Sequence, residues 1–515
     1  MRPGLSARVL WSGVLAGGLA GLALTVVLLI LRDLAGVPLI SELGADRTLP
    51  LLPVNTFLHL IGIFGGTMIS KEIAYFASFV GQVVAGTVAG VLFVLFARNR
   101  RNRGLVLGAG VVVVWLGFLA FFFPVLDSNY RGVPSSLAGL TTALGLLAGL
   151  AVFALVLGIS YDALTAARPA GNPRGAVAGD LSRRRFVVAG SSLVVLAAAS
   201  GGLIARLFQR GAFIYDGTQT PGPLDPVTPT DKFYVVTKNL IDPYVDQSTW
   251  RLQVSGLVEE PKSYDYQALM ALPAVRQEST MECISNGVGY HLLSNARWKG
   301  VRLSELLAAS RMRPGVVQVV LHGADGFNHT MSTEKAMEDS TLVAYEMNGE
   351  PLRQRHGAPA RVVVPSSYGE MNVKWLTRIS LVDHDEKGYY EQQGWNPDTV
   401  HTMSRIDFPK ATPVSLAQMP TVRVQGVAFA GIRGISTVEM TVDGGLSWLP
   451  VTIDYAPAKT AWTLWHSDWQ PGNPGEYVVM VRARDASGDL QSSTRRGTAP
   501  AGATGYHHVK VHVTA

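Results

Sequence analysis

Long apolar runs alternate with short polar segments over the first two hundred residues. Each of five runs is about 20 residues or longer, the length that an α-helix needs to cross a bilayer, and the runs cover residues 9–31, 73–97, 104–126, 137–158 and 186–205. Arginines flank them at 2–8, 98–103 and 168–185. The positive-inside rule places these groups in the cytoplasm and everything after residue 206 outside it. The pattern predicts a membrane region over residues 1–206 with about five helices.

A further apolar run at residues 51–69 is broken by Pro53, Asn55, His59 and two adjacent glycines. We interpret it as an interfacial helix in the external loop, because a true span here would reverse the topology downstream. The arginine-rich segment 182–186 precedes the fifth run and is similar to a twin-arginine export signal. The alternative is an ordinary cluster of cytoplasmic arginines.

The second half of the chain has the pattern of soluble domains. A linker rich in Pro and Thr over residues 207–230 precedes alternating strand signals at 250–256, 316–321, 361–364 and 376–382 and a helical signal at 303–309. This mixture predicts an α+β domain over residues 231–410. From about residue 411 to 515, short strands recur with turns at 443–445 and 471–475, which predicts a β-sandwich.

Composition agrees with a membrane region and limits the possible cofactors. The mean hydropathy is +0.22, with 48% hydrophobic and 16% charged residues. The net charge of +6 comes largely from arginines beside apolar runs, so it indicates membrane topology and no nucleic-acid partner. Cys283 is the single cysteine. One cysteine excludes an intrachain disulfide, a four-cysteine zinc site and a C-x-x-C-H haem attachment.

The residues around Cys283 carry a family resemblance. Residues 281–286 read Met-Glu-Cys-Ile-Ser-Asn, and 295–301 read Asn-Ala-Arg-Trp-Lys-Gly-Val. Together they resemble the molybdopterin-binding domain of the sulfite oxidase and assimilatory nitrate reductase superfamily, in particular its membrane-anchored bacterial members. The resemblance implies a molybdenum cofactor whose metal is held by the Cys283 thiolate, a soft ligand. It also implies a bacterial cell membrane location, with the catalytic domain outside the cytoplasm.

Three further segments resemble the family in the same order. Residues 342–352 resemble the segment with an active-site tyrosine, here Tyr345. Residues 356–365 and 370–376 resemble the two that grip the pterin and its phosphate. The resemblance implies that these and a nearby acidic residue bind the cofactor: His356, Arg361, Asn372, Val373, Lys374 and Asp325. A phosphate needs fixed cationic donors, and Arg361 and Lys374 would supply them.

One departure bears on the substrate. Sulfite oxidases carry an Arg-Asn-His run whose arginine faces the substrate anion, and the corresponding place here reads Lys238-Asn239-Leu240. Lysine keeps the charge but loses the bidentate fork, which argues against sulfite. We expect Lys238 to attract a polar or anionic substrate, and Thr237 and Asn239 to contact the cofactor.

The C-terminal sandwich resembles the family's second domain, which is immunoglobulin-like and often mediates dimerisation. The hairpin at residues 438–448 carries this resemblance. It implies a possible homodimer through this domain.

The resemblance implies an enzyme that transfers an oxygen atom to or from a small polar substrate. Cys283 would tune the metal, and Tyr345 would hydrogen-bond the reacting oxygen. Of 11 histidines, His59 alone precedes residue 291, so we expect no bis-histidine haem in this chain, an anchoring role for the helices, and a separate electron carrier, either quinone-linked or a soluble cytochrome. Two alternatives remain: a reductase of methionine sulfoxide or other S- or N-oxides, and a non-catalytic external binding module.

Overall fold

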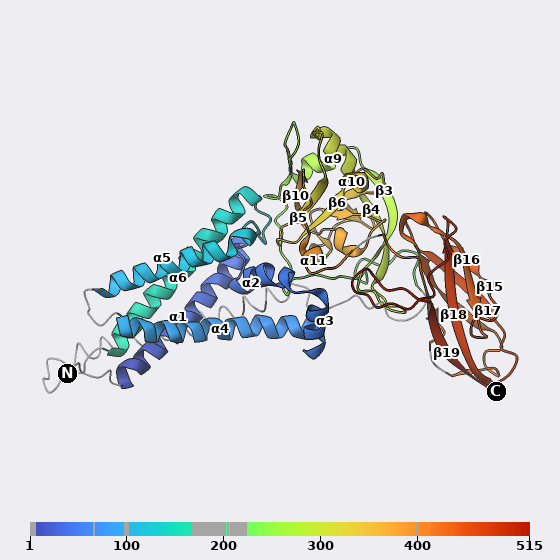
Figure 1. The fold of residues 1–515 in the computed structure, drawn as a ribbon, viewed down its shortest axis with the longest axis horizontal. Helices are drawn as coiled ribbons and strands as arrows, with labels where there is room; N and C mark the ends of the chain where they lie inside the picture. The colour runs from blue at the N-terminus through green and yellow to red at the C-terminus, as the bar shows by residue number, and fades with distance from the viewer. Residues whose placement is uncertain are drawn as a thin grey trace.

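A helical region, an α+β domain and a β-rich domain follow one another along the chain (Figure 1). The computed structural model describes residues 7–64, 67–96, 102–165, 224–396, 399–410 and 413–515, together with residues 202 and 205. Apart from those two positions, the fifth apolar run at 186–205 lies outside the described residues. The arginine-rich segment 182–186 and the linker before residue 224 also lie outside them.

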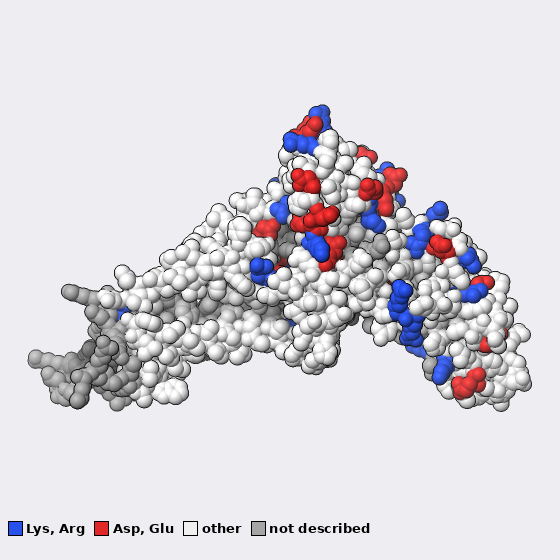
Figure 2. Space-filling model, in the orientation of Figure 1, with Lys and Arg blue, Asp and Glu red and all other residues white. Residues whose placement is uncertain are grey.

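The first four predicted runs are helices: α1 (Ala7–Ala35), α4 (Thr67–Phe96), α5 (Arg103–Phe122) and α6 (Ser135–Thr165). All four are long and apolar enough to cross a membrane. Their visible surface carries few charged side chains, whereas acidic and basic residues are spread over the other two domains (Figure 2). This contrast is expected if the helices face lipid.

Glycines allow α1 and α4 to pack unusually closely. Gly13, Gly17 and Gly21 on α1 face Gly86 and Gly90 on α4. A Cβ added at Gly17 would lie 2.1 Å from the carbonyl oxygen of Gly86, and one at Gly90 would lie 2.0 Å from that of Gly13. In lipid, where helices gain little from apolar burial, such backbone approach is a main source of association.

The run at residues 51–69 does not form one long helix. Helix α2 (Ile40–Thr48) and the 3-10 turn η1 (Leu49–Leu51) lead to α3 (Val54–Ile63), and residues 67–69 belong to α4. With 10 residues, α3 is too short to span a bilayer. The prediction that this run is not a span agrees with the structure.

The α+β domain contains one mixed and one antiparallel sheet, and residues of both contribute to a common core. One sheet has the order β2-β1-β10-β5-β6, with β1 parallel to β10 and β10 antiparallel to β5. Its strands are β1 (Leu252–Gly256), β2 (Lys262–Tyr264), β5 (Gln318–Gly323), β6 (Asn328–Ser332) and β10 (Leu376–Val382). The other comprises β3 (Val275–Glu282), β4 (Leu293–Arg302), β7 (Leu342–Met347), β8 (Glu350–Pro351) and β9 (Arg361–Val363), with β9 paired to β7.

Short helices connect these strands. They are α8 (Tyr266–Met270), α9 (Leu303–Ala309), α10 (Thr333–Ala336), η5 (Gln354–His356), η6 (Gly369–Met371) and α11 (Tyr389–Gln392). The predicted helix at 303–309 and the predicted α+β character are both confirmed.

The C-terminal part contains two sheets that enclose a second core. The first is β11 (Met403–Phe408), β13 (Val422–Phe429), β17 (Thr463–Trp469) and β16 (Thr452–Tyr455). The second is β12 (Val414–Ser415), β19 (His507–Thr514), β18 (Gly475–Asp485), β14 (Ile435–Thr441) and β15 (Leu449–Pro450). Val424 and Trp465 of one sheet pack with Met440, Val481 and Val511 of the other. Strand β11 pairs with β13, so this sheet includes a strand that the sequence prediction assigned to the preceding domain.

The helical region docks on the α+β domain through backbone hydrogen bonds. The Asn129 amide donates to the Ala324 carbonyl at 2.9 Å, and the Tyr244 amide donates to the Tyr130 carbonyl at 3.0 Å. The buried Arg32 side chain donates to the Ile241 carbonyl at 3.0 Å and pairs with Glu42. These directional contacts fix the orientation of the helices against the domain, which a flexible anchor would not require.

Candidate functional site

A cavity of about 400 Å³ lies between the α+β domain and the α3–α4 segment. Of the eleven residues expected to contact the cofactor or substrate, nine line this cavity, one lies beside it, and Tyr345 lies elsewhere. Those that line the cavity are Thr237, Lys238, Cys283, Asp325, His356, Arg361, Asn372, Val373 and Lys374. Asn239 does not line it but binds Asp325, which does.

Cys283 follows β3 and is buried at the cavity wall. Its Sγ lies 3.0 Å from the Ser285 hydroxyl. Burial raises the pKa of the Cys283 thiol to about 11, although the hydrogen bonds of Ser285 oppose the shift. The free thiol therefore holds its proton at neutral pH, and a metal ion binding there would have to displace it.

Two buried cations lie on the same wall. The Arg361 guanidinium donates to the carbonyls of His356 at 3.1 Å and Asn372 at 3.0 Å. Burial lowers the pKa of Arg361 to about 10. Burial lowers the pKa of Lys374 to about 8, with Asp242 opposing and Arg361 adding to the shift. Neither cation forms a salt bridge among the described residues, so both can bind a multiply charged anion.

The chain around these cations is arranged by hydrogen bonds. The His356 Nε2 lies 2.7 Å from the Thr230 carbonyl oxygen, and burial lowers the pKa of His356 to about 3, so the ring is neutral. Asn372 Oδ1 accepts from the Val364 amide at 2.7 Å, and the Val373 carbonyl accepts from the Val362 amide at 2.9 Å. The two loops that carry the cations are thereby held together.

Gly357 allows the same loops to approach. Its φ is +101°, and a Cβ there would lie 3.0 Å from the Lys374 Cα and 3.1 Å from the Arg361 Cβ. Any larger residue would therefore be strained and would separate the two cations.

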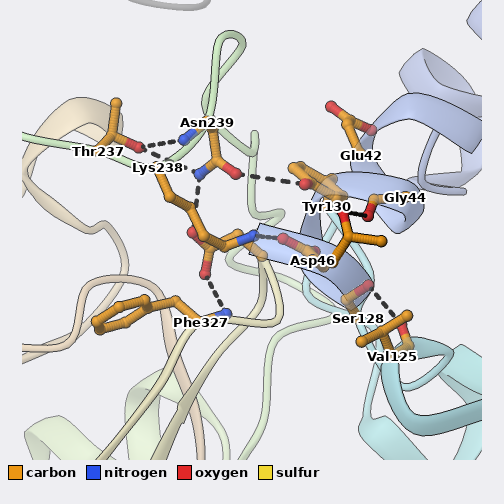
Figure 3. A network of polar contacts seen from close by, with 12 residues as sticks. Glu42, Gly44, Asp46, Val125, Ser128, Tyr130, Thr237, Lys238, Asn239 and Phe327 are labelled. Carbon is orange, nitrogen blue, oxygen red and sulfur yellow. Dashed lines mark hydrogen bonds and ion pairs between the residues drawn. The ribbon is translucent and has the colours of Figure 1, made fainter. Parts of the chain in front are cut away.

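The segment 237–239 is tied to Asp325. The Asn239 Nδ2 donates to Asp325 Oδ2 at 2.7 Å, and the Asn239 amide donates to the Thr237 hydroxyl at 3.2 Å (Figure 3). Tyr130, from the loop between α5 and α6, donates to Asn239 Oδ1 at 3.3 Å. Asn239 thus links the helical region to a carboxylate of the cavity wall.

Lys238 forms an ion pair with Asp46 of α2 (Figure 3). Burial raises the pKa of Asp46 to about 6, although Lys238 opposes the shift. Burial alone would lower the pKa of Lys238, but the charges of Asp46 and Asp325 raise it overall. Lys238 therefore faces the cavity as one half of an ion pair, and its attraction of a polar or anionic substrate stays a prediction.

The structure does not place Tyr345 at the cavity, where the family resemblance led us to expect it. Tyr345 lies in the core of the α+β domain, 1% exposed, with its ring edge-to-face against Tyr266 at 6.3 Å between centroids. Successive side chains along β7 point to opposite faces of the sheet, and Tyr345 points to the face that covers the core. Other aromatic residues line the cavity, among them Phe327, Tyr389, Tyr390 and Trp395.

Sequence reasoning missed several polar residues of the cavity wall, including Lys71 and Glu370. Lys71 of α4 donates to the Thr237 carbonyl and, at 3.4 Å, to the Asn239 carbonyl. Glu370 of η6 has an Oε1 atom that is buried without a hydrogen-bond partner among the described residues. Burial, and secondarily Glu391, raises the pKa of Glu370 to about 8. In the sequence, the feature that could have pointed to Lys71 is its position as a basic residue at the start of an apolar run.

The chemistry of this donor set fits a molybdopterin cofactor. The thiol of Cys283 can provide a metal ligand, and the buried cations Arg361 and Lys374, which form no salt bridge among the described residues, can hold a phosphate. All three residues line the same cavity.

Comparisons with known proteins agree with this chemistry. The oxidoreductase molybdopterin binding domain matches residues 239–390, and the Mo-co oxidoreductase dimerisation domain matches residues 401–514. A sulfite oxidase of Arabidopsis thaliana is 27% identical over 52% of this chain and 82% of its own length. The mitochondrial sulfite oxidase of Drosophila melanogaster is 28% identical over 56% of this chain, but the match spans 59% of that protein.

A solved structure is also similar. The sulfane dehydrogenase SoxCD of Paracoccus pantotrophus is 23% identical, with a TM-score of 0.46, over 56% of this chain and 84% of its own. The two family models match consecutive parts of the chain, and the two sulfite oxidases match 52% and 56% of its length. The chain belongs to the sulfite oxidase family and is a molybdopterin-dependent oxidoreductase.

Proposed function

We propose that this protein is a membrane-anchored enzyme that transfers an oxygen atom to or from a small polar substrate and exchanges electrons with a separate carrier. The observation that carries the proposal is the presence of Cys283, Arg361 and Lys374 on one cavity wall. When bound, the molybdenum centre supplies the two-electron oxygen-atom chemistry. Cys283 would hold the metal, and Arg361, Lys374 and neutral His356 would fix the pterin and its phosphate.

The substrate class follows from Lys238. Because Asp46 compensates its charge, the cavity presents a weaker electrostatic attraction for an anion such as sulfite than a free arginine would. A neutral, polar S-oxide or N-oxide fits this wall better. Reduction of methionine sulfoxide or a related S-oxide is therefore the second candidate function within the same family.

The proposal also covers the location of the enzyme, its oligomeric state and its electron carrier. The four apolar helices support a multi-pass bacterial membrane protein. Together with the predicted fifth span at residues 186–205, they would make five crossings from a cytoplasmic N-terminus and put the catalytic domain outside the cytoplasm. The matched dimerisation domain supports a homodimer through residues 411–515, for which an immunoglobulin-like fold is proposed. Residues 1–206 would form the membrane region, 207–230 the linker and 231–410 the catalytic domain. The carrier would be quinone-linked or a soluble cytochrome.

Elemental analysis of the purified full-length protein tests the proposal. About one molybdenum per chain is expected, and Cys283→Ser should lose activity while it still binds the pterin through Arg361 and Lys374. A molybdenum-free chain from a host that makes the cofactor would instead favour the binding-module alternative. Steady-state assays with artificial electron carriers, comparing sulfite oxidation with methionine sulfoxide reduction, then separate the two candidate reactions.

A further inference from the structure

The cavity has two chemically different ends. One end carries the cofactor-binding side chains described above. The other is formed by the helical region, where α3 and α4 contribute a wall that is mainly apolar: Phe57, Leu58, Leu60, Ile61, Phe64 and Ala74. A pterin with its phosphate has no need of this apolar wall, so the wall is available to another ligand.

The apolar wall is fixed beside the metal ligand. The Val54 amide of α3 donates to the Gln393 carbonyl at 2.8 Å, and the Gln393 side chain donates to the Leu49 carbonyl at 2.9 Å. Val54 and Leu58 pack in a cluster that includes Ile284, the residue after Cys283. The position of α3 is therefore set by the α+β domain itself.

The same wall continues into a surface suited to lipid. Phe64 lines the cavity and is 47% exposed, and Ile69, Ile73 and Phe76 at the start of α4 are 46–53% exposed. Exposed apolar residues then continue along α4 as Val80, Val84 and Val88. Because α4 is long enough to span a membrane, a bilayer around it would meet the cavity at this end.

We infer that this apolar end binds a lipid-soluble quinone, which serves as the electron carrier directly and without an intervening protein. The inference rests on the proposed function and names its redox partner. A quinone has an apolar tail and ring, which suit α3 and lipid, and carbonyl oxygens that need a donor. Lys71 can supply one, because its ammonium has three N–H groups and two carbonyls share them here.

The electrons balance for either direction of catalysis. A substrate, one water and a quinone give the oxygenated substrate and a quinol, with two electrons and two protons passing to the quinone. The reverse reaction takes two electrons and two protons from the quinol and releases water and quinone. No other oxidant or reductant is required. The helical region then acts as part of the active site, in addition to anchoring the enzyme.

Photolabelling of the full-length holoenzyme in lipid nanodiscs with an azidoquinone tests the inference, since labelling does not depend on turnover. The label is expected on the peptide that contains α3 and the start of α4, and unlabelled decylubiquinone should compete for it. Ile61→Gln, on the cavity wall, should weaken competition about tenfold because it places an amide in an apolar site. Ile63→Gln, on the same helix but 62% exposed and outside the wall, should not.

Three outcomes would overturn the inference: no specific labelling, labelling confined to another part of the chain, or equal effects of the two glutamines. Molybdenum content is measured on the same samples. A molybdenum-loaded protein without quinone labelling would refute the quinone site and leave the proposed enzyme intact. A molybdenum-free protein that still labels on α3 would refute the enzyme and leave the quinone site.

Discussion

Lys238 and Asp46 form a buried ion pair between the catalytic domain and helix α2, and both side chains are 6% exposed. They are separated by 192 positions in the sequence. Removing one partner of such a pair leaves the other as an uncompensated buried charge. The pair thus couples the charge of the cavity to the helical region.

Anion affinity should depend on pH through this pair. Because burial raises the pKa of Asp46 to about 6, the carboxylate takes up a proton as pH falls through about 6, while Lys238 stays charged. Protonation of Asp46 adds one positive charge to the cavity, so inhibition by sulfate should strengthen on the order of tenfold between pH 7 and pH 5, below the range in which Lys374 and Glu370 titrate. Asp46→Asn should show the strong inhibition already at pH 7. Equal sulfate inhibition of both proteins at pH 7 would contradict this.

Loss of Arg361 should reduce cofactor binding. Arg361→Met keeps an apolar side chain of similar length but removes charge-assisted hydrogen bonds to a phosphate, so pterin content should fall by about ten- to a hundredfold. Fluorescence of the pterin released from the purified protein measures this. Arg423→Met, at a side chain that is 54% exposed in the C-terminal domain, serves as the control. Full pterin content in Arg361→Met would show that the phosphate is held elsewhere.

The glycine contact between α1 and α4 should be essential for the folding and stability of the helical region. Gly86→Val would place a Cβ 2.4 Å from the Gly17 carbonyl oxygen and force the helices apart. We expect a lower thermal midpoint in detergent and less folded protein in the membrane. Gly81→Val, on the same helix with nothing within 4 Å of the added Cβ, should behave as wild type. Similar losses in both variants would indicate a general intolerance of valine in α4.

Glu370 should make stability depend on pH. Its folded-state pKa is raised from 4.5 to about 8, so the folded chain keeps a proton that the unfolded chain loses, and stability falls as pH rises through that window. Glu370→Gln removes this penalty. The variant should therefore have a higher thermal midpoint than wild type at pH 8 and nearly the same midpoint at pH 4.5.

Differential scanning fluorimetry at one fixed scan rate measures these midpoints. Glu259→Gln, at a side chain that is 57% exposed, should match wild type throughout. A Glu370→Gln midpoint that does not rise relative to wild type at pH 8 would show that the carboxylate is stabilised in the folded protein.

The sequence by itself determined the local elements and the chemistry of the metal end. Apolar runs predicted four helices that the structure contains, and period-two patterns predicted strands such as β1 and β10. The motifs around Cys283, His356, Arg361 and Lys374 predicted a shared cofactor site, and all four line one cavity. Such features are readable because helix and strand periods, and short motifs, are encoded by residues near one another.

Tertiary structure alone decided which other residues take part in the cavity. Tyr345 carries the family motif but turns into the core, whereas Tyr389 faces the cavity. Lys71, Asp46 and Ile61 belong to the helical region, yet they lie against the catalytic domain and form part of its cavity or its charge balance. No local pattern encodes these contacts, because they arise where two regions distant in the sequence pack together, and the position of each side chain depends on the surface that the other region presents.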